Sequence, residues 1–269
     1  MDAISEALKI VRGVLPKMEC RLDEPMKNHT SFKIGGPVRA MFFPESAADI
    51  GELTGTLSKC GAATLVMGNG TNLLADDGTL DLVVINTTGL SFIERTGVYE
   101  IRAGAGVSLS RLAGFACECG LSGIEFAHGI PGTLGGAVSM NAGAFDADMA
   151  DVVCSATVFG ANTGQAAYTG AELGFSYRHS RFSECGDVII SADIRLRDGD
   201  AESIKAKIDQ LSDRRRESQP LDLPSAGSTF KRPKAGYAAE LIEQAGLKGF
   251  AFGGAQVSEK HSGFVVNRG

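Results

Sequence analysis

Apolar residues recur every three to four positions in five stretches of the chain, and this spacing predicts helices. The stretches are residues 2–15, 46–60, 108–119, 200–216 and 237–245. Asp2 and Ser108 can cap the first and the third, and Ser46 with Asp49 can form a capping box at the second. Gly120 stands where a left-handed residue would end the third helix.

Continuous or alternating apolar runs predict strands between these helices. They cover residues 38–43, 64–67, 81–86, 98–103, 152–159, 165–169, 188–196 and 264–267. A further strand is expected over 27–34, turned back onto 38–43 by Gly35 and Gly36. The run over 64–67 is expected to be a buried strand, because it is a continuous β-prone apolar run that ends at a glycine-rich segment.

Two glycine-rich segments interrupt this pattern. The longer one, residues 127–145, lies in a stretch without Asp, Glu, Lys or Arg, and its five glycines argue against a helix or a membrane span running through it. The shorter one reads Gly-Asn-Gly-Thr-Asn over 68–72 and follows an expected strand. Backbone N–H groups in such loops form concave anion sites, so we interpret both as parts of a cofactor site. The alternative is a glycine-rich turn between packed strands.

The common nucleotide signatures are absent from the sequence. Leu73 stands where the third glycine of a G-x-G-x-x-G motif would follow Gly68, and Leu109 does so after Gly104. No G-x-x-x-x-G-K-[ST] motif occurs either. The glycine segments therefore predict phosphate binding without a Rossmann or P-loop fold.

Composition narrows the class of protein. Glycine makes up 35 of the 269 residues, close to twice the usual share of about 7%, which favours a loop-rich ligand-binding protein. The formal net charge of -6 argues against a nucleic-acid partner. Six cysteines follow no zinc spacing, the histidines have no metal spacing, and the first residues lack the apolar core of a secretory signal. We expect no metal, no membrane contact and a cytoplasmic location.

Four motifs in the chain resemble one enzyme family. They are Gly68–Leu73, Ile130–Ala137, Tyr177-Arg178-x-Ser180, and Ala226-Gly227-Ser228-x-Phe230-x-x-Pro233. In this order they are similar to the UDP-N-acetylenolpyruvoylglucosamine reductases, and the resemblance runs from about Asn28 to the last residue. It implies an α+β fold, with a two-part FAD-binding domain of the vanillyl-alcohol oxidase (PCMH) type followed by a small α/β substrate domain. The expected bounds are 1–27 for an N-terminal helix and lead-in, 28–198 for the FAD-binding domain and 199–269 for an incomplete substrate domain.

The resemblance also implies a reaction. NADPH reduces FAD, and the flavin then reduces the enolpyruvyl double bond of UDP-N-acetylglucosamine enolpyruvate, which yields UDP-N-acetylmuramate for peptidoglycan. The residues expected to bind the cofactor are Gly68, Asn69, Gly70, Thr71, Asn72, Leu73, Gly129, Ile130, Pro131, Gly132, Thr133, Gly135, Gly136, Ala137, Asn141 and Gly143. We expect a monomer with this one small-molecule substrate.

Two residues match the family's catalytic groups. Arg178 would bind the carboxylate on which charge builds, since a guanidinium presents a planar fork to a carboxylate. Ser228 would donate the proton that completes the reduction. Tyr177 is expected to orient the substrate, and Lys231 with Arg232 to bind its diphosphate. Without the resemblance, Ser228 would be an ordinary turn residue and Arg178 an ion-pair partner.

One departure from the family pattern concerns the C-terminal end. A glutamate that supports proton transfer in the family would lie beyond Gly269, so we expect a C-terminally truncated chain with lowered turnover. The strand at 264–266 is then expected to be unpaired and exposed. Two other functions stay open: a flavin-binding remnant with little turnover, and an FAD-dependent oxidase on the same scaffold. The three arginines at 214–216 are expected to form a solvated helix end.

Overall fold

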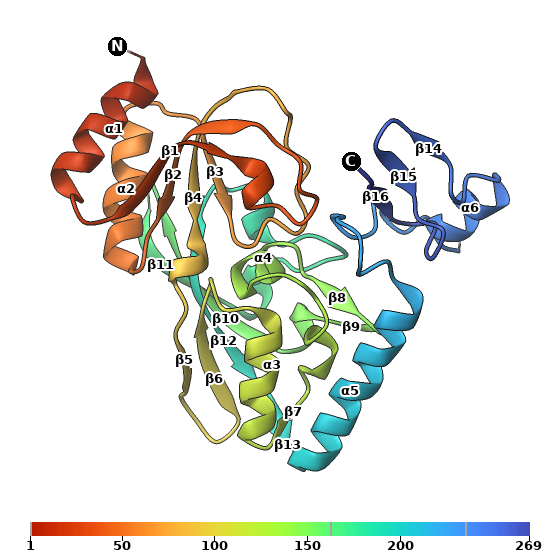
Figure 1. Ribbon diagram of the computed structural model, residues 1–269. Coiled ribbons are helices and arrows are strands. Elements are labelled where there is room, and N and C mark those ends of the chain that lie inside the picture. Colours follow the sequence, from red (N-terminus) through yellow and green to blue (C-terminus); the bar gives the residue numbers. More distant parts are fainter. Residues whose placement is uncertain (1, 162, 235) are drawn as a thin grey trace. The chain divides into compact units, whose positions relative to one another are not determined.

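The computed structural model describes residues 2–161, 163–234 and 236–269. The chain forms two compact units, each described by itself below (Figure 1). The first unit comprises the residues up to Glu24, Val38–Gly68 and Asp81–Leu211. The second comprises Pro25–Pro37, Asn69–Leu80 and Ser212–Gly269. These bounds differ from the expected ones at 27 and 198. The early segments Pro25–Pro37 and Asn69–Leu80 belong to the second unit, and the later division falls after Leu211, inside a helix.

The first sheet has four strands in the order β1-β2-β4-β3. Their bounds are Glu19–Pro25 for β1, Pro37–Phe43 for β2, Thr64–Met67 for β3 and Leu80–Asn86 for β4. Strand β3 pairs parallel with β4 and is the last strand of this sheet, so Val66 is 37% exposed and only Met67 is buried. The prediction of a buried strand over 64–67 was therefore wrong about burial, because an edge strand is covered from fewer sides.

Helices α1 (Ala3–Val14) and α2 (Ala47–Lys59) pack against each other beside this sheet (Figure 1). The predicted caps are confirmed. Asp2 accepts a hydrogen bond from the Ser5 N–H at 2.8 Å, and Ser46 and Asp49 form the reciprocal capping box. Such caps typically contribute about 1 kcal/mol each, since they satisfy donors that the helix leaves open.

The second sheet is antiparallel throughout, in the order β11-β10-β12-β6-β5. The strands are β5 (Ile93–Arg95), β6 (Glu100–Gly104), β10 (Val153–Gly160), β11 (Gly164–Thr169) and β12 (Val188–Arg195). Helix α3 (Leu109–Glu118) begins after Ser108, whose hydroxyl accepts from the Arg111 N–H, and ends before Gly120 at φ 68°. The predicted start and end of this helix are thus confirmed.

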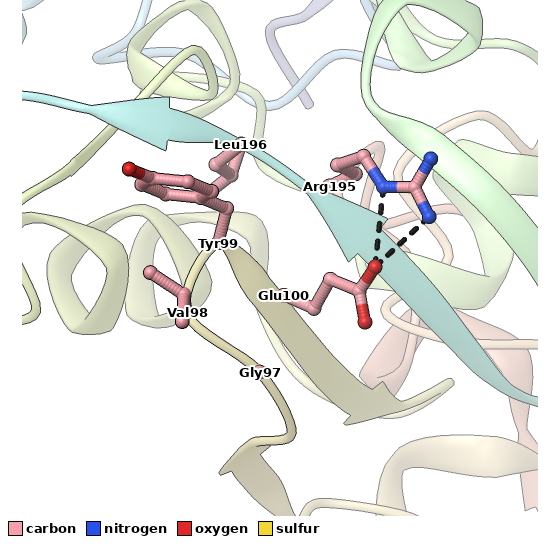
Figure 2. Close-up of a pocket in the computed structure, with 6 residues that line it drawn as sticks. All are labelled: Gly97, Val98, Tyr99, Glu100, Arg195 and Leu196. Atoms are coloured by element: carbon pink, nitrogen blue, oxygen red, sulfur yellow. Dashed lines mark hydrogen bonds and ion pairs between the residues drawn. The ribbon is translucent and has the colours of Figure 1, made fainter.

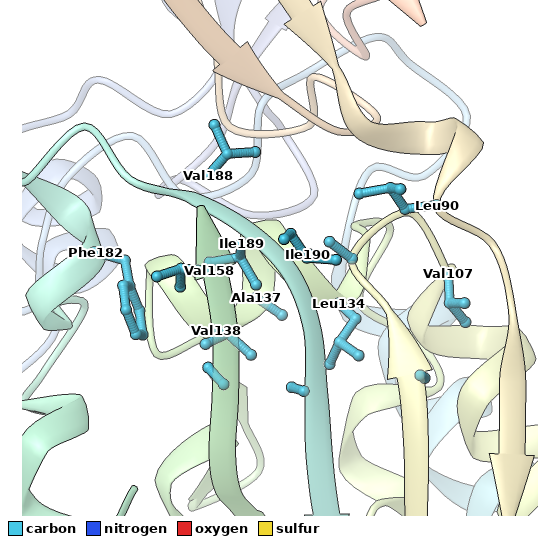
Figure 3. Packing of buried hydrophobic residues seen from close by; sticks show 14 of the residues in the cluster. Leu90, Val107, Leu134, Ala137, Val138, Val158, Phe182, Val188, Ile189 and Ile190 are labelled. Atoms are coloured by element: carbon cyan, nitrogen blue, oxygen red, sulfur yellow. The ribbon is translucent and has the colours of Figure 1, made fainter. Parts of the chain in front are cut away.

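A short helix lies within the glycine-rich stretch. Helix α4 (Leu134–Ser139) packs against β12, where Leu134, Ala137 and Val138 are buried among side chains from the second sheet (Figure 3). The prediction that no helix runs through this stretch was therefore too strict. Burying an aliphatic side chain gains about 1.5–3 kcal/mol, which offsets the cost of two glycines in six residues.

The smaller elements connect these layers. Two short antiparallel pairs are β7 (Leu121–Ser122) with β13 (Arg197–Asp198), and β8 (Gly143–Ala144) with β9 (Ala147–Asp148). The 3-10 turns are η1 (Met26–Asn28), η2 (Thr87–Gly89), η3 (Glu125–Ala127), η4 (Met149–Asp151), η5 (Gly170–Leu173) and η6 (Arg181–Ser183). The strand predicted over 27–34 is wrong: η1 and turns occupy that range, while β1 before it was not predicted.

Helix α5 (Ala201–Ser218) spans the division between the units and buries the predicted face of Ile204, Ile208 and Leu211. Near its end Arg215 is half-buried and donates to the Gln219 side chain at 2.8 Å, and burial lowers the pKa of its guanidinium. The arginine run is therefore only partly the solvated helix end that was expected.

The second unit contains α6 (Ala238–Gln244) and a three-stranded antiparallel sheet, β14-β15-β16. Its strands are Ala251–Phe252, Ala255–Val257 and Val265–Asn267. The expectation of an unpaired, exposed strand at 264–266 was wrong, since β16 pairs with β15 and Phe264 and Val266 are 6% and 0% exposed. Among the described residues, no helix is both long and apolar enough to cross a membrane.

Candidate functional site

The first part of the site lies in the first unit, where Gly68 meets the longer glycine segment. Gly68 follows β3, and a Cβ placed on it would lie 2.1 Å from the Thr133 hydroxyl oxygen. A Cβ on Gly135 would lie 2.8 Å from the Ala105 Cβ, while the Gly135 N–H donates to the Ala105 carbonyl at 2.8 Å. Glycine suits both positions because a Cβ there would overlap the Thr133 side chain in one case and the Ala105 Cβ in the other.

Thr133 occupies the N-cap position of α4 but does not act as a cap. Its side chain makes no cap hydrogen bond, and its buried hydroxyl oxygen has no hydrogen-bond partner in the structure. A buried hydroxyl without a partner costs about 1–3 kcal/mol, so this position is suited to a ligand that supplies one.

Asn141 is buried at the end of the same stretch, with a left-handed φ of 42° and 2% exposure. Its Nδ2 donates to the Asp148 carboxylate and to the Ser176 carbonyl, both at 3.0 Å. Its Oδ1 accepts from the Ala150 N–H at 2.9 Å. Both amide hydrogens are committed within the protein, so the side chain has no donor left for the cofactor that was expected there.

Tyr177 and Arg178 lie at the tip of a two-residue turn that Ser176 and His179 close with reciprocal backbone hydrogen bonds of 3.0 and 3.2 Å. The Arg178 guanidinium donates to the carbonyls of Asn141 at 3.4 Å and Gly143 at 3.0 Å. It also lies 5.2 Å from the centre of the Tyr177 ring. Within the described part of the chain no carboxylate pairs with it, which disfavours the ion-pair interpretation.

Ser180, which belongs to the same motif, anchors this turn. It is 0% exposed, and its hydroxyl donates to the Ser139 carbonyl at the end of α4 at 2.7 Å. The Ser183 hydroxyl donates to the same carbonyl at 2.7 Å. The turn carrying Arg178 is thus tied to the helix of the glycine stretch at one end and to Asn141 at the other.

The second unit holds the remaining predicted residues. Ser228 is exposed, and its backbone forms an isolated antiparallel β-bridge with Phe264. The N–H of the next residue, Thr229, donates to the Gly263 carbonyl at 2.9 Å. Gly227 before it has a φ of 83°, which only glycine adopts readily. The residues of this unit that were predicted as site residues are Asn69, Gly70, Thr71, Asn72, Leu73, Ser228, Lys231 and Arg232.

Two cations follow Ser228 in the chain. Lys231 is exposed, and the Arg232 guanidinium stacks on the Tyr237 ring at 4.0 Å. Stacking of this kind orients a guanidinium. The Ser225 carbonyl, three residues before Ser228, accepts from the Ser31 hydroxyl at 2.6 Å, which ties the segment to the early part of the same unit.

An open hollow of about 290 Å³ lies elsewhere, at the loop between β5 and β6 (Figure 2). None of the predicted site residues lines it. Its two charged residues, Arg195 and Glu100, pair with each other at 2.9 Å, as Figure 2 shows. Exposed pairs of this kind contribute about 0–1 kcal/mol and bring no free charge to a ligand.

Comparison with known proteins gives the chain's family. A model of the UDP-N-acetylenolpyruvoylglucosamine reductase C-terminal domain matches residues 219–269, and an FAD binding domain matches residues 38–167. The chain is 46% identical over 259 residues to the UDP-N-acetylenolpyruvoylglucosamine reductase of Caldanaerobacter subterraneus, covering 96% of this chain and 85% of that enzyme. That of Agathobacter rectalis is 45% identical, over 97% and 87% of the two chains. The chain belongs to the UDP-N-acetylenolpyruvoylglucosamine reductase family.

Solved structures agree with this family. The reductase from Thermus caldophilus has a TM-score of 0.80 and 33% identity, and the match covers 94% of this chain and 89% of that one. Physcomitrella patens BBE-like 1, at 14% identity and a TM-score of 0.56, and an alkyldihydroxyacetonephosphate synthase, at 16% and 0.56, share the fold of the FAD-binding part. The predicted fold class, an α+β protein with a PCMH-type FAD-binding domain, is confirmed.

The residues present in the reductase chain fit an FAD. The matched FAD-binding region contains the close approach of Gly68 to Thr133 and the buried Thr133 hydroxyl without a partner. A dinucleotide offers both the donors and the acceptors that such a hydroxyl needs. Among the described residues, no group of three metal-ligating side chains gathers.

Sequence reasoning missed Asp148 and Ser176, which hold the site together, and it considered Ser139 only for its side chain and not for its carbonyl. Asp148 and Ser176 accept the two hydrogen bonds of the Asn141 amide, and Ser139 accepts those of Ser180 and Ser183. The contact between Asn141 and Ser176 spans 35 positions, so no pattern in either segment indicates it.

Proposed function

We propose that this protein is an FAD-dependent oxidoreductase that uses NADPH to reduce UDP-N-acetylglucosamine enolpyruvate to UDP-N-acetylmuramate, a step of peptidoglycan precursor synthesis. Membership of the reductase family over nearly the whole chain supports this activity. The single structural observation that carries it is the Arg178 guanidinium, held by two backbone carbonyls and paired with no described carboxylate.

The FAD would be held by the glycine segments around Gly68 and Thr133, and it supplies the hydride transfer between nicotinamide and substrate. Main-chain N–H groups of these segments suit a diphosphate, and the Thr133 hydroxyl would gain the partner it lacks. The predicted cofactor residues remain proposals, except that the Asn141 side chain is taken out of the set because its donors are used within the protein.

Arg178 would bind the carboxylate of the enolpyruvyl group. Negative charge increases at that carboxylate when hydride adds to the double bond, and a guanidinium already in position needs no reorganisation as the charge grows. The two backbone carbonyls use part of the five N–H donors of Arg178, and the rest can form the paired hydrogen bonds that carboxylates prefer. Tyr177, exposed beside it, would orient the substrate.

Ser228 would donate a proton to the carbon next to the carboxylate. Its exposure and its place beside a glycine with a φ of 83° make the hydroxyl accessible on a constrained loop. A serine hydroxyl is a weak acid, but the carbon that hydride addition leaves electron-rich is a strong base, so position matters more than acidity. Lys231 and Arg232 follow on the same segment and would bind the substrate's diphosphate.

We also propose that the protein acts in the cytoplasm as a monomer. NADPH and nucleotide sugars are cytoplasmic metabolites, and all six cysteines are free, as in reducing compartments. Light scattering on a size-exclusion column tests the oligomeric state directly.

The decisive experiment is a reconstituted assay. The purified chain is loaded with FAD, freed of excess cofactor, and given NADPH with and without UDP-N-acetylglucosamine enolpyruvate. We expect NADPH oxidation that depends on the sugar nucleotide and a product mass two hydrogens higher. A protein that binds FAD yet consumes no NADPH with this substrate would be the flavin-binding remnant instead. Oxygen consumption with a sugar or alcohol donor would indicate the oxidase.

A further inference from the structure

We infer that Asn141 is a positioning residue that fixes the Arg178 guanidinium by holding the turn of residues 176–179 against the β8–β9 hairpin. The inference rests on the proposed function of Arg178. It assigns to Asn141 a role through another residue in place of a direct contact with the cofactor.

Asn141 connects three separate backbone segments through one side chain. Its Nδ2 donates to the carbonyl of Ser176, the first residue of the turn. The same Nδ2 donates to the Asp148 carboxylate at the end of β9. Its Oδ1 accepts from the Ala150 N–H in η4. The Asn141 side chain is buried and all three of these bonds hold it in one orientation, because moving it would leave its own amide atoms without partners.

The main chain of Asn141 acts on the same guanidinium. Its carbonyl and that of Gly143 accept from the two terminal nitrogens of Arg178, at 3.4 and 3.0 Å. The direction of the Asn141 carbonyl depends on its left-handed φ of 42°, which asparagine tolerates better than most residues. Side chain and backbone of one residue therefore hold both the base of the turn and the tip of Arg178.

The backbone around this contact is strained in a way that needs such support. Of the six non-glycine residues with positive φ in the described part of the chain, four lie here: Asn141, Phe145, Asp146 and Arg178. Phe145 and Asp146 form the two-residue loop of the β8–β9 hairpin, a position that usually holds Asn-Gly. Such a residue persists only when its surroundings hold it in place, which is typical of a preorganised site.

Electrostatics explain why an amide stands at position 141. The Asp148 carboxylate accepts from the Ala150 N–H with one oxygen and from Asn141 with the other. In Asn141→Asp two carboxylates would face each other at about the distance of the present hydrogen bond. The Ser176 carbonyl would lose the Asn141 donor and keep only the His179 N–H. Asn141→Gly keeps the left-handed backbone and the carbonyl to Arg178 but removes the side chain.

The test compares Asn141→Gly, Asn141→Asp and the control Asp151→Ala in the FAD-loaded protein. The Asp151 side chain accepts from the Asp148 N–H at the start of η4. Among the bonds of the described residues, none joins Asp151 to the turn of residues 176–179. Stopped-flow absorbance measures flavin reduction by NADPH and flavin reoxidation by the enolpyruvyl substrate separately. Hydrogen exchange measures the protection of the Ser176 and His179 amides, which close the turn.

We expect both Asn141 variants to reoxidise the flavin about tenfold or more slowly at low substrate, through a raised KM, with flavin reduction by NADPH within about twofold of the unchanged protein. The Ser176 and His179 amides should exchange about tenfold faster, while Asp151→Ala behaves as the unchanged protein. Adding Asn141→Gly to Arg178→Ala should cost nothing further, since the two residues act as one unit.

Three results would overturn the inference: equal slowing of both half-reactions, an additive loss in the double variant, or unchanged amide exchange in Asn141→Gly. If the unchanged protein loads FAD but does not turn over, the proposed function fails. The exchange of the 176–179 amides then still decides whether Asn141 holds the turn.

Discussion

At the scale of single residues, the site depends on groups whose hydrogen bonds are already made. Arg178 is fixed by carbonyls, and no carboxylate of the described residues neutralises its charge. The side chains of Asn141 and Ser180 donate to backbone carbonyls around Arg178. Thr133 is the contrast, because its hydroxyl is buried and has no partner. Residues that position a ligand are satisfied internally, whereas a residue that contacts a ligand has capacity left.

Ser228 gives a prediction at this scale. In Ser228→Ala we expect kcat to fall by about 10² to 10⁴, the usual contribution of a positioned proton donor, while flavin reduction by NADPH stays unchanged. Rapid-mixing kinetics of the two half-reactions measure both quantities. Thr229→Ala is the matched control, because Thr229 is equally exposed and contributes a backbone hydrogen bond that the substitution keeps. A Ser228→Ala protein with full turnover would show that the proton comes from elsewhere.

At the scale of elements, the glycine segments matter because of where they meet. Gly68 begins the loop after β3 and lies against the Thr133 side chain at the start of α4, so only that side chain separates an edge strand from a short helix. A strand at the edge and a helix of six residues are both weak elements alone. Helix α4 is stabilised by burying Leu134, Ala137 and Val138 in the core of the first unit, and β3 by its pairing with β4.

Gly68→Ala should lose most of its flavin. The new Cβ would lie 2.1 Å from the Thr133 hydroxyl oxygen and 3.0 Å from the Thr133 Cβ, so Thr133 would have to move. The ratio of flavin to protein absorbance measures the loss. Gly55→Ala is the control, because Gly55 lies in α2 and no atom lies within 4 Å of the position that its Cβ would take. The free energy of unfolding of this variant should rise by about 0.5–1 kcal/mol, and the variant should keep its flavin. Full flavin content in Gly68→Ala would remove this contact from the site.

His261, in the turn before β16, should make the stability of the protein depend on pH. Burial lowers the pKa of His261 below its usual value of 6.5, its own backbone opposes this, and the Lys248 charge adds to it. The neutral ring also accepts from the Gly263 N–H at 3.1 Å, a bond that protonation of that nitrogen removes. The unfolded chain takes up the proton first, so this contribution is complete above pH 6.5 and is lost as pH falls through the folded pKa.

The free energy of unfolding should therefore decrease between pH 7.5 and pH 5.5, as urea unfolding followed by circular dichroism measures. His261→Asn keeps an acceptor near the Gly263 N–H and cannot titrate, so its decrease over the same range should be smaller. An equal decrease in the two proteins would show that His261 does not titrate differently on folding.

At the scale of the whole molecule, the two units are not continuous segments of the chain. The second unit takes residues from three separate stretches, and the Asn267 side chain donates to the Phe32 carbonyl across 235 positions. Ser31 makes a similar bond to Ser225. The C-terminal unit is therefore built partly from the early chain, which a domain boundary placed along the sequence cannot represent.

FAD should stabilise the folded protein by mass action. A ligand that binds only the folded state at 100 times its Kd adds about 2.7 kcal/mol, which raises the melting temperature by a few degrees for a chain of this size. Differential scanning calorimetry with rising FAD measures the effect. Riboflavin at equal concentration, which lacks the diphosphate, should raise it less. A melting temperature that does not respond to FAD would contradict a cofactor role for the glycine segments.

The sequence alone determined the helix caps, most strands and the four motifs that indicate the family. These signals act between neighbours, as between Ser46 and Asp49 or Ser108 and Arg111, so the local chain contains all the information they need. The same holds for the identities of Arg178 and Ser228 as candidates, since short motifs carry them.

Only the tertiary structure decided which segments meet. It placed β3 at an edge, paired β16 with β15, brought Gly68 against Thr133 and joined Asn141 to Ser176. Each of these contacts gains its free energy from burial and hydrogen bonding between segments that the sequence separates. No local pattern specifies such a contact, because its stability depends on the packing of the unit around it.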